Sequence, residues 1–295
     1  MIKQTLFFTT PVFLSLKYNQ LVIQREGVNE IITRPIEDIG FVIVENQKVR
    51  FTISLLNALA DNHVSVVFCN DRSMPCSMLM SLDSNVVQQE VYRYQVETSK
   101  PNQKRIWKEV ITAKIRNQAA LLHRLGKDGD ELKPYYTNVL SGDSTNREGI
   151  AARQYWKQLF GATFTRQREG ASPNALLNYG YAILRAATTR ALLGSGLFPA
   201  FGIFHCNRYN AFPLADDMME PYRPFVDEIV YHLYQNDIDV VLDTEVKQHL
   251  VRVLHTDVFM NKQVHPLQIA LTYTSASLVK ALKDKEETVK FPTLL

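Results

Sequence analysis

The sequence predicts an α+β protein with a β-rich N-terminal domain, residues 1–84, followed by an all-helical C-terminal domain, residues 85–295. In the first part, apolar residues come in short runs rich in β-branched and aromatic side chains, which is typical of strands. From Asn85 onward the apolar residues recur with the 3.6-residue period of helices. This change of period sets the boundary between the two domains.

Turn-prone residues separate the individual elements of the β-rich part. We expect strands over 12–16, 20–24, 36–44 and 63–68, one helix over about 52–61, and a loop at 70–75. In the second part, two neighbouring apolar stripes predict one long helix: Ile106, Val110, Ala113, Asn117 and Ile111, Ile115, Ala119. A further helix is expected to begin with Ser172 as N-cap and Pro173 at the first position, and to end at Gly194.

The composition is that of a soluble globular protein. Of the 295 residues, 46% are hydrophobic and 21% charged, and every longer apolar stretch is interrupted by charges, so we expect neither a signal peptide nor a membrane span. The three cysteines, Cys69, Cys76 and Cys206, lack Cys-x-x-Cys spacing. They are interpreted as reduced thiols in a cytoplasmic protein.

The formal net charge of +3 is unevenly distributed. Residues 1–84 carry −1 (7 Lys+Arg, 8 Asp+Glu), residues 85–190 carry +8 (17 and 9), and residues 191–295 carry −4 (9 and 13). A basic middle third favours a polyanionic partner, although helix surfaces are often basic without one. Six basic residues are candidates for contacts with DNA phosphates, and the four on the predicted long helix also fit a solvated helix face: Arg147, Arg208, Lys100, Lys104, Arg105 and Lys108.

Carboxylates, an imidazole and arginines gather in three segments, TNREGIAARQYW at 145–156, FHCNRYNAF at 204–212 and LADDMMEPYRP at 214–224. Glu148, His205 and Glu220 form a hard set of oxygen and nitrogen ligands, which suits Mg²⁺ or Mn²⁺ with open positions for water and substrate. A divalent ion beside arginines is typical of enzymes that transfer phosphodiesters. Pro221 and Pro224 predict a helix break that would let Glu220 face inward.

Each of these candidates also has a structural interpretation, and composition alone does not single them out. Thr145 and Glu148 fit a capping box, with Thr as N-cap and Glu three positions later. His205 follows an apolar run and fits a histidine of the core. Asp216 or Asp217 fits the N-cap of a short helix.

Five phrases carry a resemblance to a known family: AKIRNQA at 113–119, EGIAARQYWKQLFG at 148–161, NALLNYGYAILR at 174–185, HCNRYNAF at 205–212 and LADDMMEPYRPFVD at 214–227. The chain resembles the CRISPR-associated integrase/endonuclease family (Cas1), the spacer-acquisition proteins, and is most similar to its type II branch. The resemblance covers most of the predicted helical domain in the family's order, and the N-terminal third more weakly.

The resemblance implies a β domain that dimerises and a helical domain that holds a divalent ion, Mg²⁺ or Mn²⁺, through Glu148, His205 and Glu220. Many members have Asp as the third ligand, and some have a second His where Cys206 stands. It also implies a homodimer, a heterohexamer with the small second adaptation protein (Cas2), and possible association with the Cas9 effector. The expected substrates are a short protospacer duplex with 3′-hydroxyl ends and the CRISPR repeat, joined by transesterification in defence against foreign DNA.

Two other function classes remain open from the residues. One is a metal-dependent RNase or a phosphoesterase acting on a small substrate; the basic middle third favours a long polyanion but does not separate DNA from RNA. The other is a non-catalytic DNA-binding scaffold, in which Glu148 serves only as a cap and Asp216 and Asp217 only begin a helix.

Overall fold

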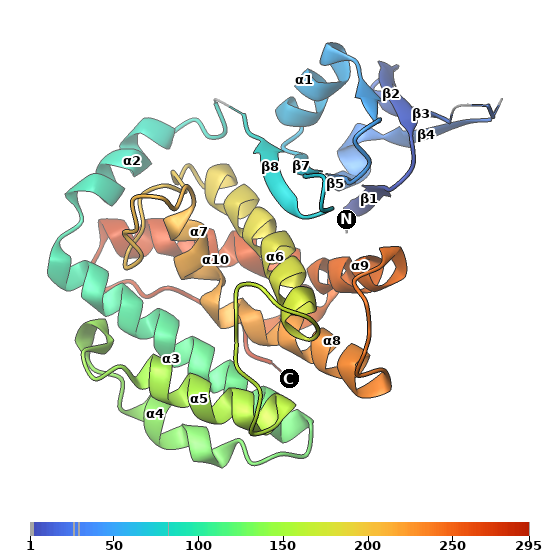
Figure 1. The fold of residues 1–295 in the computed structure, drawn as a ribbon. Helices are drawn as coiled ribbons and strands as arrows, with labels where there is room; N and C mark the ends of the chain where they lie inside the picture. Colours follow the sequence, from blue (N-terminus) through green and yellow to red (C-terminus); the bar gives the residue numbers. More distant parts are fainter. Residues whose placement is uncertain (1–2, 26, 29, 82, 295) are drawn as a thin grey trace. The chain divides into compact units, whose positions relative to one another are not determined.

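A computed structural model describes residues 3–25, 27–28, 30–81 and 83–294. The chain divides into two compact units, Met1–Ser84 and Asn85–Leu295 (Figure 1). Strands dominate the first unit and helices the second, which confirms the α+β class.

Two four-stranded sheets make up the N-terminal unit. One has the order β1-β5-β7-β8, with β1, β5 and β7 parallel and β8 antiparallel. The other has the order β4-β3-β2-β6, with β2, β3 and β4 antiparallel and β6 parallel to β2. The elements are β1 (Gln4–Phe8), β2 (Val12–Lys17), β3 (Gln20–Arg25), β4 (Ile31–Pro35), the 3₁₀ helix η1 (Ile36–Asp38), β5 (Ile39–Val44), β6 (Arg50–Phe51), α1 (Ile53–Asp61), β7 (Ser65–Cys69) and β8 (Pro75–Leu79).

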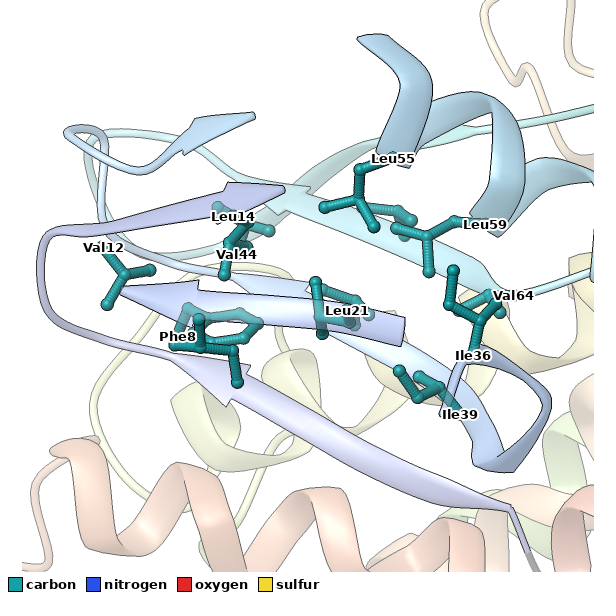
Figure 2. Packing of buried hydrophobic residues seen from close by; sticks show 13 residues of the cluster. Phe8, Val12, Leu14, Leu21, Ile36, Ile39, Val44, Leu55, Leu59 and Val64 are labelled. Atoms are coloured by element: carbon teal, nitrogen blue, oxygen red, sulfur yellow. The ribbon is translucent and has the colours of Figure 1, made fainter. Parts of the chain in front are cut away.

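The core of this unit draws apolar side chains from both sheets and from α1, as Figure 2 shows. Leu14 and Leu21 come from one sheet, Ile39 and Val44 from the other, and Leu55 from the helix. All six residues of β5 are buried, and neighbouring strands pair with it on both edges. A strand buried in this way has a continuous apolar sequence rather than an alternating one.

The strand and helix predictions are confirmed in position for β2, β3, β5, β7 and α1. The segment Ile36–Asp38 is the exception, since it forms a 3₁₀ turn before β5. The sequence analysis missed β1, β4, β6 and β8. All four lie at sheet edges, and β4 and β8 have no buried residue, so these two lack the apolar signal of a buried strand.

The C-terminal unit is built around the long helix α3, which packs against α4, α5, α7 and α8 (Figure 1). Its helices are α2 (Gln88–Glu97), α3 (Lys100–Arg124), α4 (Lys133–Thr137), α5 (Arg147–Phe160), α6 (Asn174–Gly194), α7 (Pro213–Met219), α8 (Arg223–Asn236), α9 (Thr244–Val251) and α10 (Leu267–Lys283). Short 3₁₀ turns join them: η2 (Asp130–Leu132), η3 (Ser141–Asp143), η4 (Glu220–Tyr222) and η5 (Arg252–His255).

Two details of the predicted helical domain are wrong. It is not all-helical, because β9 (Asp257–Met260) and β10 (Gln263–Pro266) form an antiparallel hairpin. The hairpin strands are only four residues long, too short for a clear period. Helix α6 ends at Gly194 as predicted, but Pro173 rather than Ser172 occupies its N-cap position, and the Ser172 hydroxyl donates to the carbonyl of Val240 instead.

Within the described ranges, no helix combines the length and the apolar character needed to cross a bilayer.

Candidate active site

Glu148 stands in the first turn of α5 and does not cap it, so the predicted capping box is wrong. The N-cap is Asn146, whose side chain accepts from the amide of Gly149 at 3.2 Å. The buried carboxylate of Asp143 accepts from the amides of Arg147 and Glu148, at 2.8 and 3.0 Å. Because these groups satisfy the amides at the start of the helix, the carboxylate of Glu148 is available for another role.

The Glu148 and Glu220 carboxylates meet at the ammonium of Lys114. Lys114 Nζ lies 2.5 Å from Glu148 Oε1 and 2.6 Å from Glu220 Oε2. Lys114 belongs to α3, Glu148 to α5 and Glu220 to η4, so three elements that are far apart in sequence converge on one nitrogen. Burial alone would lower the pKa of Lys114, but the two carboxylates outweigh it and raise the pKa, so the ammonium is charged.

Glu220 lies where the chain changes from α7 to η4, and Pro221 follows it, as the predicted helix break requires. Only 4% of its side chain is exposed. Its second oxygen, Oε1, pairs with the guanidinium of Arg223 at 2.9 Å. Burial works to raise the pKa of Glu220, but Arg223 and Lys114 lower it on balance, so the buried carboxylate is ionised.

His205 is held at the edge of the site by Asp217. The ring Nδ1 lies 2.6 Å from Asp217 Oδ1, and the histidine side chain is 40% exposed, so it is not a histidine of the apolar core. The hydrogen bond to Asp217 is the largest of the effects that raise the pKa of His205, and Glu220 adds to them. The ring therefore lies in the electric field of Glu220, one of the two candidate carboxylates. Its Nδ1 is hydrogen-bonded to Asp217, and Nε2 lies on the other side of the ring.

Asp217 is fully buried and organises the loop that carries His205. Besides the ring, its carboxylate accepts from the amides of Ile203, Phe204 and His205, at 2.6, 2.9 and 3.2 Å. Neither Asp217 nor Asp216 is the N-cap of α7, which is Phe212, so that interpretation is wrong. Asp216 instead pairs with Arg185 at 2.6 Å.

Two aromatic rings fix the orientation of the imidazole. Trp107 of α3 is buried and stacks on Phe204, with ring centroids 4.2 Å apart and planes 3° from parallel. The rings of His205 and Trp107 are nearly perpendicular, at 88°, and their centroids are 5.7 Å apart. Trp107 and Lys114 are seven residues apart on α3, and therefore on one face of it, so a single helix supports both the histidine and the carboxylates.

The Glu148 and Glu220 carboxylates, which have the chemistry of divalent-ion ligands, meet at an ammonium in this structure. Among the residues that the structure describes, no group of three or more His, Cys, Asp or Glu side chains is arranged to hold a metal as it stands. However, the Lys114 nitrogen shows that Glu148 and Glu220 can both contact one cation. Two carboxylates with an imidazole beside them are the ligand types that Mg²⁺ and Mn²⁺ accept.

The candidate DNA-binding residues divide into exposed and internally bonded ones. Lys104 and Lys108 are exposed and four residues apart, hence on one face of α3. Lys100 bonds to Gln103 at 3.0 Å. Arg105 is engaged within the fold, through Glu109 at 2.7 Å and the carbonyl of Ala281, so it is the weakest of the helix candidates.

The two arginines beside the candidate ligands differ in their surroundings. Arg208 is exposed, and its guanidinium lies over the ring of Tyr209, 4.6 Å from the centroid. Arg147 is half-buried next to Glu148, and its Nε is buried with no hydrogen-bond partner. A buried guanidinium nitrogen without a partner is costly, which makes Arg147 the stronger candidate for an anion contact.

Sequence reasoning missed Lys114, Trp107 and the true role of Asp217. A signal for Lys114 was present, because it lies three residues after Ile111 and four after Val110, on the buried face of a helix. A lysine on an apolar stripe predicts a buried carboxylate partner. No comparable signal identifies Asp217, because its partners are backbone amides of another segment.

Comparison with known proteins gives consistent matches along the whole chain. The family model described as "CRISPR associated protein Cas1" matches residues 6–264. A protein of Neisseria meningitidis serogroup C named "CRISPR-associated endonuclease Cas1" is 37% identical over 286 residues, covering 96% of this chain and 93% of that protein.

Solved structures show the same fold. A casposase bound to its integration product has a TM-score of 0.78 at 20% identity, covering 98% of this chain and 92% of the other. A chain of a Cas6-RT-Cas1–Cas2 complex has a TM-score of 0.74 at 18% identity, covering 98% of this chain and 36% of the other. The family match over most of the sequence, together with a relative of 37% identity along nearly the full length, shows that the chain belongs to the CRISPR-associated Cas1 family.

Proposed function

We propose that this chain is a divalent-metal-dependent DNA endonuclease and integrase of CRISPR adaptation, of the type II branch that its motifs resemble. The proposal is that it joins the 3′-hydroxyl ends of a short protospacer duplex to the CRISPR repeat. The observation that carries it is the meeting of Glu148 and Glu220 at one cation, with His205, held by Asp217, in the electric field of Glu220. The endonuclease name of the meningococcal relative and the integration product of the casposase support the same chemistry.

In the proposed reaction, a 3′-hydroxyl oxygen forms a bond to phosphorus as the bond to the leaving 3′-oxygen breaks, so no covalent enzyme intermediate is needed. Mg²⁺ or Mn²⁺, when bound, would lower the pKa of the attacking hydroxyl and neutralise charge on the phosphate. Glu148, Glu220 and His205 would hold the ion. Arg147, beside Glu148, would contact the phosphodiester through its guanidinium.

The local geometry disfavours the scaffold alternative. That interpretation needs Glu148 as a helix cap and Asp216 and Asp217 as helix starters. Asn146 and Asp143 cap α5 instead, and Phe212 precedes α7. Burying Glu220 with its ion pairs would add little stability to a purely structural protein, because the cost of desolvating a buried ion pair can exceed its attraction.

The direct test compares strand transfer and DNA binding in the same preparations of Glu148→Gln, His205→Ala and Glu220→Ala. Integration of a 3′-hydroxyl duplex should fall by at least about 100-fold while DNA affinity stays within a few-fold, because phosphate contacts supply the affinity. Glu97→Gln, an exposed position on α2, is the matched control. Integration at the wild-type rate in all three variants would end the assignment, and faster cleavage of RNA than of DNA would favour the RNase alternative.

The proposed assembly is a homodimer that joins Cas2, with residues 1–84 at the dimer interface; association with the Cas9 effector is a further expectation. Because residues 1–84 are near neutral, two copies of this segment would repel each other little, whereas two copies of the basic middle third would repel each other strongly. A solved relative is named as part of a Cas1–Cas2 complex, which supports the partner. Sedimentation should show a dimer for the full chain, and a fragment 85–295 that dimerised equally tightly would move the interface elsewhere.

A further inference from the structure

Lys114 is an unusual element of the candidate site because it occupies the position where the proposed metal ion would contact the carboxylates. Its side chain is 10% exposed, and its ammonium touches one oxygen of Glu148 and one of Glu220. Bonds from Mg²⁺ to carboxylate oxygen are about 2.0–2.1 Å long. Two cations cannot both occupy the space between the same two oxygens, so the ammonium must move before an ion can bridge them.

The formal charges of the four groups in direct contact here cancel. Glu148 and Glu220 contribute two negative charges, and Lys114 and Arg223 contribute two positive ones. A divalent ion added to this arrangement would face two cations at short range, and repulsion of that kind is large in a buried site. Either a cation must leave or an anion must enter together with the ion.

Of the two cations, Lys114 is the one able to leave. Arg223 lies over the ring of Tyr181, 4.7 Å from the centroid, and its planar guanidinium is held there as well as by Glu220. A lysine ammonium is a compact charge on a flexible four-carbon chain and can swing to a new partner. The natural new partner is a phosphate oxygen of the bound nucleic acid. Its negative charge would replace that of the carboxylates, which would then bind the metal ion.

We propose that Lys114 is a built-in counter-cation that holds the two carboxylates together in the metal-free protein, competes with the divalent ion, and moves to the phosphodiester when ion and DNA bind. Tight metal binding then requires DNA, which keeps the nuclease idle until its substrate is present. This inference rests on the proposed metal site at Glu148 and Glu220. Lys114 is a positioning residue in this scheme.

The test measures Mn²⁺ binding to the full-length protein without DNA, by electron paramagnetic resonance of the free ion. Lys114→Met removes the charge and keeps a similar side-chain length. Its Mn²⁺ affinity should exceed that of the wild type by at least about tenfold, because a like charge near the ion is gone. Lys157→Met, an exposed position on α5, is the matched control and should bind as the wild type does.

DNA provides the second measurement. Adding a short duplex should tighten Mn²⁺ binding to the wild type by at least about tenfold, and should tighten binding to Lys114→Met much less. Equal or weaker Mn²⁺ affinity in Lys114→Met, compared with the wild type, would overturn the inference. So would an equal effect of DNA on the two proteins.

Thermal unfolding separates competition from a merely structural role. In EDTA, Lys114→Met should melt below the wild type, because two carboxylates then face each other without the ammonium, and Mn²⁺ should raise its melting temperature more than that of the wild type. A deficit that Mn²⁺ does not reduce would mean that Lys114 only stabilises the fold. If Lys114→Met folds only with Mn²⁺, the inference is supported directly.

Glu148→Gln distinguishes this inference from the function on which it rests. If Glu148→Gln loses Mn²⁺ binding and Lys114→Met gains none, the metal site stands and the competition is rejected. If Glu148→Gln binds Mn²⁺ as tightly as the wild type, the metal site itself is rejected, and the competition with it.

Discussion

Replacing Asp217 with Asn should loosen the loop that presents His205, although the substitution replaces only one oxygen by an NH₂ group. The carboxylate is fully buried and has two oxygens, each accepting two hydrogen bonds. Oδ2 accepts from the amides of Ile203 and Phe204, at 2.6 and 2.9 Å. Oδ1 accepts from the amide and from the ring Nδ1 of His205, at 3.2 and 2.6 Å.

The magnitude follows from the number of donors left without an acceptor. An Asn NH₂ turned toward Ile203 and Phe204 would face two amide donors, so two buried hydrogen bonds would be lost. Turned toward His205, it would lose the bond from the His205 amide and keep a bond to the ring only with Nδ1 as acceptor, so at least one buried hydrogen bond is lost in either orientation. Each lost bond to a buried donor costs about 1–3 kcal/mol. Part of this is offset, because burial raises the pKa of Asp217, which means that the folded protein carries a cost for the buried charge that Asn would not. The expected net loss of stability for the loop is about 1–3 kcal/mol.

Hydrogen exchange measured on the peptide covering residues 198–210 tests this directly. A loop opening made easier by that amount exchanges roughly 5- to 150-fold faster. Asp216→Asn is the matched control for the amides of residues 203–205, because the Asp216 carboxylate binds Arg185 and Asn210 and none of these amides. Unchanged exchange at residues 203–205 in Asp217→Asn would refute the reasoning, because Asp217 is the acceptor of all three amides.

Two further predictions concern pH and salt. Burial raises the pKa of Asp227 to about 6, although hydrogen bonds from Tyr181 and Tyr155 act to lower it. The folded state therefore holds the carboxyl proton of Asp227 more tightly than the unfolded chain does. Stability should therefore fall as pH rises from about 4 to 6, by up to about 3 kcal/mol, and urea unfolding of Asp227→Asn should lack that part of the decline. DNA affinity should fall steeply between about 50 and 200 mM salt, because the basic middle third neutralises phosphates and thereby releases the counterions condensed on the DNA. An affinity independent of salt in a filter-binding titration would show that those charges are only a solvated surface.

The fold class was predictable because it depends on local sequence patterns. Strands β2, β3 and β7 are short runs rich in β-branched and aromatic residues, and the long helix α3 repeats apolar residues with a period of 3.6. The edge strands β4 and β8 and the hairpin β9–β10 have no such signal, because they are short and partly exposed and gain their stability from partners elsewhere in the chain.

Cap positions were less predictable than the helices themselves. Thr145 and Glu148 satisfy the capping-box spacing, yet Asn146 adopts a left-handed conformation, with φ of 51°, and starts the helix one residue later. The shift occurs because Asp143, from the preceding 3₁₀ turn, takes two of the amides that a capping box would satisfy. Several residues near a helix start can cap it, and the tertiary context selects among them.

The candidate site shows why ligand types can be inferred from sequence more easily than the arrangement around them. Glu148 and Glu220 were identified from the chemistry that their segments contain, but Lys114 lies in a different segment, on a helix whose period signals only burial. Its role follows from charge balance, which becomes visible when α3, α5 and η4 are placed together. A buried carboxylate has to be neutralised in every state of the protein, whether by an ammonium, a metal ion or a proton. For that reason, a basic residue on a buried helix face should be weighed with any acidic ligand set found in the same sequence.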